Sequence, residues 1–221
     1  MVSTKYYSKM ISILKNAKDN EGNTRFHVAV KQSKLDVCRI LISDKHVDKN
    51  PKDNDGNTPL HLAIKEGYKG VCRFLIESRQ VEKNPRNNDG RTPLHLAVEQ
   101  SKIDVCQVLI RKRQIDKNPR DNNGYTPLHL AVIQGKSYLC RVLIESKQVD
   151  KNPTDKNGRT PLHLAAQYGH LTCFKILIEG GAEINTKSPD GMRPLDLVSE
   201  NNRSEVSAIL NKMKQKRIVT Q

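Results

Sequence analysis

Polar and apolar residues follow one another in short blocks, and the pattern is clearest between residues 53 and 85. A cluster of Asp, Asn and Gly at 53–57 predicts a turn in which Gly56 takes a positive φ angle. Thr58 is a natural N-cap, and Pro59 suits the first helical position because its missing N–H would be unpaired there. The apolar residues that follow predict a short helix starting at Pro59.

A second apolar stretch begins after Gly67 and has the spacing of a helix that is buried on one side. Its apolar residues are Val71, Cys72, Phe74, Leu75 and Ile76. The residue before a proline prefers an extended backbone, so Asn84 and Pro85 predict a return to loop. The block therefore predicts a loop, a helix, a turn, a second helix and another loop.

The block recurs along the chain at a step of 34 residues. Glycine occupies positions 22, 56, 90, 124 and 158, and Gly191 follows after 33 residues. Threonine and histidine keep the same register, at Thr24, Thr58, Thr92, Thr126 and Thr160 and at His27, His61, His95, His129 and His163. Five copies in one register predict a repeat protein.

Four stretches read Thr-Pro-Leu-His-Leu-Ala, at 58–63, 92–97, 126–131 and 160–165. They resemble the ankyrin repeat, whose signature has this core. The resemblance covers about residues 19–211, as five full repeats and a divergent sixth that start near 19, 53, 87, 121, 155 and 188. It implies an all-α repeat solenoid of stacked helix-turn-helix units, with projecting loop or β-hairpin fingers and a concave face that binds proteins.

The ends of the chain depart from the repeat. The first repeat reads Thr-Arg-Phe-His at 24–27 and the last reads Arg-Pro-Leu-Asp at 193–196, and both resemble caps because terminal repeats need a polar outer face. Residues 1–18 are interpreted as a basic N-terminal capping segment, and residues 212–221 as a basic C-terminal tail. In the first four repeats, segments such as 78–85 replace the usual family loop and lengthen the finger by one residue.

The sequence has 221 residues, with 38 Lys and Arg against 24 Asp and Glu, for a formal charge of +14. The two terminal segments supply +8 of this charge, so the rest of the chain has a nearly balanced surface. No apolar run approaches the ~20 residues of a membrane-spanning helix, and residues 1–14 lack the apolar stretch of a secretory signal. We expect no membrane insertion and a location in the cytoplasm or the nucleus.

Five cysteines and five repeated histidines raise the question of a metal or catalytic site. Cys38, Cys72, Cys106 and Cys140 share one position in the second helix, and Cys173 lies one residue earlier. Packed helices lie ~8–10 Å apart, beyond the ~7 Å Cα limit of a disulfide, so we interpret the thiols as small buried side chains. The resemblance implies that the repeated histidine bonds the neighbouring loop, whereas His46 and His170 are expected at the surface.

Positions that vary while the frame stays fixed are candidates for recognition. In the family these are the residue after the turn glycine and the exposed end of the first helix. Residue types that dominate interfaces gather in the third to fifth repeats, at Arg91, Tyr125, Ile133, Arg159 and Tyr168. Asn57, Lys65 and Glu99 occupy the same rows. We predict that these eight residues bind a protein partner; the alternative is that Tyr and Ile only cover neighbouring side chains.

A second recurring row consists of lysines beside Asn-Pro, at Lys49, Lys83, Lys117 and Lys151. Because an acid directly precedes each lysine, we interpret the row as a solvated, partly neutralised face. The basic residues of 212–217 are interpreted as a solvated helix end, with a nuclear-localisation or nucleic-acid patch as the alternative.

No phosphate-binding, metalloprotease or nucleophile motif is present, so we predict no enzyme activity, no metal and no cofactor. The repeat fold favours a scaffold or regulator that binds another protein and is itself a monomer. The alternative is a nuclear or nucleic-acid-associated regulatory factor that uses the basic surface. Binding to nucleic acid would weaken by orders of magnitude between ~50 and ~200 mM salt, whereas recognition through an aromatic patch would not.

Overall fold

The structure is a computed structural model that describes residues 15–219. Residues 1–14 and 220–221 lie outside the described part, and with them most of the predicted capping segment 1–18 and the end of the predicted tail. The chain divides into two compact parts, an N-terminal half that ends at Asp116 and a C-terminal half that begins at Lys117.

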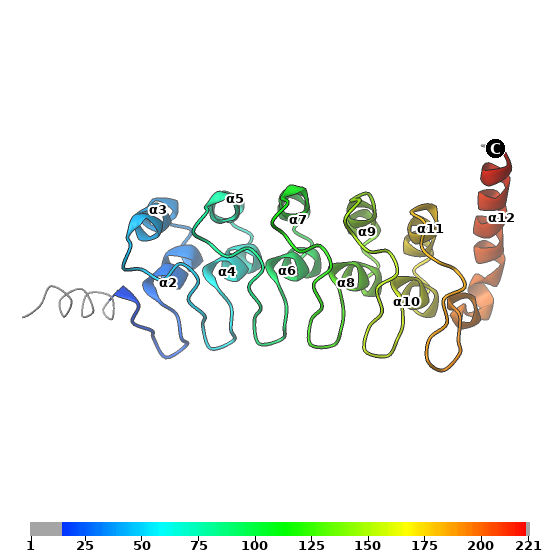
Figure 1. Cartoon of the computed structure of the whole chain (residues 1–221), viewed down its shortest axis with the longest axis horizontal. Helices are drawn as coiled ribbons and strands as arrows, with labels where there is room; N and C mark the ends of the chain where they lie inside the picture. Colours follow the sequence, from blue (N-terminus) through cyan, green and yellow to red (C-terminus); the bar gives the residue numbers. More distant parts are fainter. Residues whose placement is uncertain (1–14, 220–221) are drawn as a thin grey trace, which may run out of the picture. The chain divides into compact units, whose positions relative to one another are not determined.

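The N-terminal half contains three helix pairs. The first helices are α2 (Arg25–Lys31), α4 (Pro59–Glu66) and α6 (Pro93–Glu99), and the second helices are α3 (Leu35–Ser43), α5 (Lys69–Glu77) and α7 (Ile103–Arg111). Within this half, Figure 1 shows the first helices in one layer, the second helices in another, and the finger loops projecting from the first layer. Helix α4 contacts both α2 and α6, so each pair packs on its neighbour in sequence.

The C-terminal half contains two more pairs and the divergent last repeat. Its first helices are α8 (Pro127–Ile133) and α10 (Pro161–Gln167), and its second helices are α9 (Ser137–Ile144) and α11 (Leu171–Glu179). The last repeat has short 3₁₀ turns at Pro194–Leu197 and Glu200–Asn202, followed by α12 (Arg203–Val219). Because α12 is continuous through residue 211, the predicted boundary of the tail lies inside a helix.

Helices and loops account for all of residues 15–219, where no strand occurs, so the fold is the predicted all-helical repeat solenoid. The fingers there are loops and not β-hairpins. A finger closes on itself through bonds such as Asp53 N–H to Asn57 O at 3.0 Å. One backbone bond, such as Asn88 N–H to Asp55 O at 2.9 Å, joins it to the next finger.

The repeated histidines join successive repeats, as predicted. In the C-terminal half, His129 Nε2 lies 3.2 Å from Arg159 O, and Thr126 N–H donates to His129 Nδ1 at 3.1 Å. Since Nδ1 accepts, the proton must be on Nε2, which donates to the loop of the next repeat. In the N-terminal half, His61 makes the same two bonds, to Arg91 O and from Thr58 N–H, both at 3.1 Å. Burial lowers the pKa of His61 and of His129 to about 4.

The lysine row is not the solvated face that the sequence suggested. Lys83 is only 7% exposed and Lys117 only 4%. The Lys83 ammonium donates to the carbonyl oxygens of Ser78 and Val81, just after helix α5. Lys49 likewise donates to Leu41 O at 3.1 Å and to Val47 O at 2.8 Å. These lysines therefore satisfy the orphan carbonyls at the end of a second helix and in the loop behind it.

Asparagines connect the loops that follow the second helices. In the N-terminal half, Glu82 N–H donates to Asn50 Oδ1 at 2.7 Å, and Asp116 N–H donates to Asn84 Oδ1 at 2.9 Å. Asn84 also donates from Nδ2 to Gln114 O at 2.9 Å. The Lys-Asn-Pro segment is therefore part of the frame that ties one repeat to the next.

All five cysteines are buried free thiols, as predicted. Burial raises the pKa of Cys72 and of Cys106 to about 12, which leaves them unreactive. Cys173 differs because its earlier register brings its thiol against that of Cys140. The contact between the two thiols, together with burial, raises the pKa of Cys140.

Candidate functional site

Four of the predicted binding residues lie in the C-terminal half at the junctions of fingers and first helices. Tyr125 and Arg159 end their fingers one residue before the N-cap threonines of α8 and α10. Ile133 is the last residue of α8, and Tyr168 is the C-cap of α10. We call these four residues the tyrosine–arginine surface.

Arg159 is held by a buried carboxylate. Its Nη2 lies 2.9 Å from Asp155 Oδ2 and its Nε donates to the same oxygen at 3.0 Å. The Asp155 side chain is 1% exposed, and its other oxygen accepts the N–H groups of Asn157 and Arg159 at 2.9 and 2.8 Å. Asp155 therefore closes the finger and balances the charge of Arg159 at the same time.

The remaining bonds of Arg159 reach two neighbours on this surface. Nη2 donates to the Tyr125 hydroxyl oxygen at 3.4 Å, and Nη1 donates to Gln167 Oε1 at 3.2 Å. The guanidinium group of Arg159 thus joins the finger to the end of α10. These bonds also fix the orientation of the guanidinium group.

His170 connects Tyr168 to Ile133. The two rings of Tyr168 and His170 have centroids 6.2 Å apart, and His170 Nε2 lies 3.2 Å from Ile133 O. His46 and His170, both expected at the surface, are half-buried, and the His170 ring lies against Gly135. A Cβ atom at Gly135 would approach the imidazole to 2.9 Å, so the glycine makes room for this contact.

Sequence reasoning missed the supporting role of Asp155, Gln167 and His170. A signal for Asp155 existed, because Asp19, Asp53 and Asp121 stand at the same place, three residues before a turn glycine. Nothing comparable marked His170, since its contact with Ile133 depends on the packing of a neighbouring repeat.

The other four predicted residues lie in the N-terminal half. Arg91 Nη1 and Glu99 Oε1 form an ion pair of 2.6 Å in which both side chains are about three-quarters covered. Lys65 is exposed on the last turn of α4. Asn57 is 6% exposed, and its Oδ1 accepts from Asn87 Nδ2 at 3.2 Å, so its side chain belongs to the frame and is not displayed to a partner.

The face made by the first two fingers of the N-terminal half carries charges of both signs. A groove there is lined by Glu21, Lys31, Asp55, Lys65 and Glu66, among others. Lys31 Nζ pairs with Glu21 Oε2 at 3.0 Å and lowers the pKa of that carboxyl. This face is hydrated and ionic, unlike the tyrosine–arginine surface.

Two features are absent from residues 15–219. Nowhere in this range do three or more His, Cys, Asp or Glu side chains gather as a metal-ligand set. Within the same residues, every helix is too short or too polar to cross a membrane.

Comparison with known proteins assigns the class. The family model described as ankyrin repeats, in three copies, matches residues 2–87, 78–155 and 137–218. The chain therefore belongs to the ankyrin-repeat family. Ankyrin repeats generally serve as protein–protein interaction modules and are typically not catalytic.

Solved structures agree with this fold. The ankyrin repeat domain of Bcl-3, whose title calls it a unique member of the IkappaB protein family, is 24% identical with a TM-score of 0.82, over 92% of this chain and 91% of that chain. An ankyrin repeat domain from Acinetobacter baumannii AYE is 23% identical with a TM-score of 0.75, over 84% of this chain and 95% of that chain. A search of curated proteins finds no match.

Proposed function

We propose that the chain is a non-catalytic adaptor or regulator that holds a protein partner on the tyrosine–arginine surface of its C-terminal half. The observation that carries the proposal is the fixing of Arg159 between the buried Asp155 carboxylate and the Tyr125 hydroxyl. A surface that is ordered before binding loses less conformational entropy when a partner arrives.

The residue types on this surface favour binding. Tyr and Arg supply most hot spots of protein interfaces, because they combine large contact area with hydrogen-bonding groups. Tyr168 is 49% exposed, and Ile133 lies partly exposed at the end of α8. A partner that covers these side chains removes apolar area from water, which contributes roughly 25 cal/mol per Å².

The charge balance of the surface indicates what the partner offers. Because Asp155 neutralises Arg159 from below, a partner covers this guanidinium without burying an unpaired charge. The partner segment that fits is apolar or aromatic, with a few groups that bond to the Tyr125 hydroxyl and to Arg159. We place this activity in the cytoplasm or the nucleus.

The experiment compares partner capture by the full chain and by a double variant, Tyr125→Ala with Tyr168→Ala. Proteins captured from an extract are identified by mass spectrometry, and the affinity of the purified partner is then measured. We expect the double variant to bind at least tenfold more weakly while circular dichroism stays unchanged.

Tyr138→Ala is the matched control, because Tyr138 is also exposed, also lies in the C-terminal half and belongs to the second helix α9. It should leave the affinity within twofold. Equal affinities for the wild type and the double variant would move the binding site elsewhere on the chain.

A salt series separates this function from the nucleic-acid alternative. Affinity for the purified partner should change by a few fold at most between ~50 and ~200 mM salt, because the proposed surface is neutral overall. Tight binding of a nucleic acid to the same chain, lost by several orders of magnitude over this salt range, would instead support a nucleic-acid-associated factor.

A further inference from the structure

The loop that follows each second helix contains one position without a role in the frame. In the second repeat of the N-terminal half, Val81 is buried, Lys83 caps carbonyl groups and Asn84 bonds the next loop. Arg79 does none of these things: it is exposed and makes no hydrogen bond or ion pair with any residue of 15–219.

The same position holds a cation in every copy of this loop. Lys45, Arg79 and Arg113 occupy it in the N-terminal half, and Lys147 occupies it in its own repeat of the C-terminal half. All four side chains are exposed, and within the described residues none of the four has an ion-pair partner. We call the three cations of the N-terminal half the cation ladder.

Helix capping does not explain the cation ladder. A cation near the end of a helix is stabilised by the free carbonyls there. Behind α3 and α5 that role already belongs to Lys49 and Lys83, whose ammonium groups donate to those carbonyls. The cation ladder therefore places on the rim of the second-helix layer three positive charges that the packing between repeats does not use.

We infer that the cation ladder binds an extended acidic segment of a protein, with one carboxylate facing each repeat. Packed helices such as α3, α5 and α7 lie ~8–10 Å apart, so cations at equivalent positions have about the same spacing. A polyproline II segment has three residues per turn and rises ~3.1 Å per residue, so every third side chain returns to one face after ~9 Å. Acids at every third position of such a segment match the ladder.

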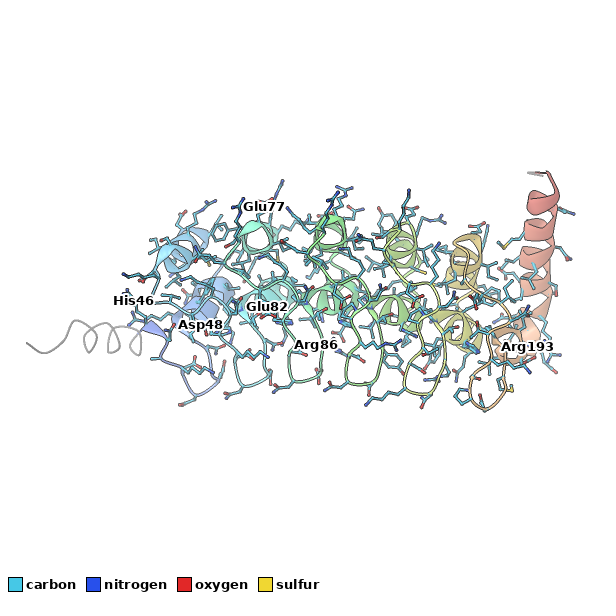
Figure 2. All side chains as sticks on the ribbon, viewed as in Figure 1. His46, Asp48, Glu77, Glu82, Arg86 and Arg193 are labelled. Atoms are coloured by element: carbon cyan, nitrogen blue, oxygen red, sulfur yellow. The ribbon has the colours of Figure 1, made fainter. Side chains whose placement is uncertain are left out.

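Acids between the cations argue against a nucleic acid as the ligand. Asp48 and Glu82 follow Lys45 and Arg79 by three residues, on the loops after α3 and α5 (Figure 2), and both are exposed. A duplex carries about one phosphate charge per 1.7 Å of its axis, so some phosphates would meet these carboxylates. A peptide with neutral residues between its acids avoids that repulsion. This surface is separate from the tyrosine–arginine surface and does not depend on it.

The test uses a fluorescein-labelled peptide of five Glu-Pro-Pro triplets and the full chain, followed by fluorescence anisotropy at about 50 mM salt. The triple variant Lys45→Gln, Arg79→Gln, Arg113→Gln should weaken binding about tenfold. Its matched control removes three other exposed cations of the same half, by Lys18→Gln, Arg25→Gln and Lys34→Gln, and should stay within twofold. The Gln-Pro-Pro peptide should not bind.

Three results would overturn the inference. One is no binding of the Glu-Pro-Pro peptide up to about millimolar protein, and another is an equal loss in the ladder and control variants, which would reflect net charge alone. The third is tighter binding of a single-stranded oligothymidylate of similar length, lost in the ladder variant, which would make the ligand a nucleic acid. Unchanged circular dichroism in both variants verifies that folding is not the cause.

Discussion

In the N-terminal half the residue before each turn glycine is an acid, Glu21, Asp55 or Asp89, whereas in the C-terminal half Asn123 and Asn157 stand there in the two full repeats. The ends of the first helices differ in the same sense. Lys31, Lys65 and Glu99 give way to Ile133 and Gln167. Both halves keep the same histidine bonds and buried thiols, so the difference is confined to side chains that the frame does not use.

This difference bears on binding because charged groups are costly to remove from water. The N-terminal face would have to lose the hydration of Glu21, Lys31 and Glu66 before a partner could cover it. On the C-terminal face, the one guanidinium is already balanced by Asp155 beneath it. One repeat architecture can therefore carry a surface suited to close contact in one half and a surface suited to solvent in the other.

The largest expected effect on stability concerns the histidine bonds that both halves share. His61 and His129 have a pKa of about 4 in the fold, against about 6.5 in the unfolded chain. The neutral form is favoured in the fold, so the full stabilisation is present above pH 6.5 and is lost as the pH falls to 4. One pKa unit corresponds to about 1.4 kcal/mol, so acidification to below pH 4 lowers the free energy of unfolding by roughly 3 kcal/mol for each of these two histidines.

Urea denaturation at pH 7, 5.5 and 4.5 measures this loss. A His61→Gln variant should be less stable at pH 7 and show a shallower pH dependence, and His129→Gln should behave alike. If the pH dependence became shallower in one variant and stayed unchanged in the other, the two histidines would not play the same role.

Asp155 and Asp53 occupy equivalent positions in the two halves and differ in what they hold. Asp53 Oδ1 accepts two backbone N–H groups, whereas Asp155 also pairs with Arg159. We expect Asp155→Ala to lower the free energy of unfolding by about 3 kcal/mol and Asp53→Ala by about 1 kcal/mol. Chemical denaturation measures both, and equal losses would mean that Arg159 is not anchored by the carboxylate.

Lys83 and Lys151 compare the same loop in the two halves. Lys83 is buried, and Lys151 is half-buried. Lys83→Met leaves the carbonyls of Ser78 and Val81 without this donor, so we expect a loss of about 1–2 kcal/mol in the free energy of unfolding. Lys151→Met should cost less, because water can reach the site. A stabilised Lys83→Met variant would contradict the capping role.

The smallest effect concerns the turn between first and second helices. Ser101 has φ +53°, and Gly135, at the same place in the next repeat, has φ +62°. Ser101→Gly should stabilise the chain by about 0.5–1 kcal/mol, because glycine adopts this conformation without strain. Gly135→Ser should destabilise it, because its Cβ would meet His170. Thermal unfolding of both variants measures the two signs.

Sequence reasoning worked where a position is repeated for a local reason. The Thr-Pro starts of α4, α6, α8 and α10 and the burial of Cys72 follow from spacing and residue type alone. It was wrong about Lys83, because a charged residue was read as solvated although a long aliphatic stem can pass through the loop to reach carbonyl groups. Asn57 was misplaced for a different reason. Its burial, like the contact of His170 with Ile133, depends on a neighbouring repeat, and the hydrophobic pattern of a single repeat contains no information about it.

The bonds between repeats also have a consequence for the length of the array. Within each half they join residues about one repeat apart, by 30 positions for His61 and Arg91, 32 for Glu82 and Asn50, and 34 for Asn88 and Asn54. Each repeat therefore offers on one side the donors and acceptors that it needs on the other. A duplicated block of 34 residues, such as 53–86, would find every partner already in place, and its deletion would let the flanking repeats bond to each other. The array can thus grow or shrink by tandem duplication and loss of whole repeats, because each new junction uses the same bonds as the existing ones.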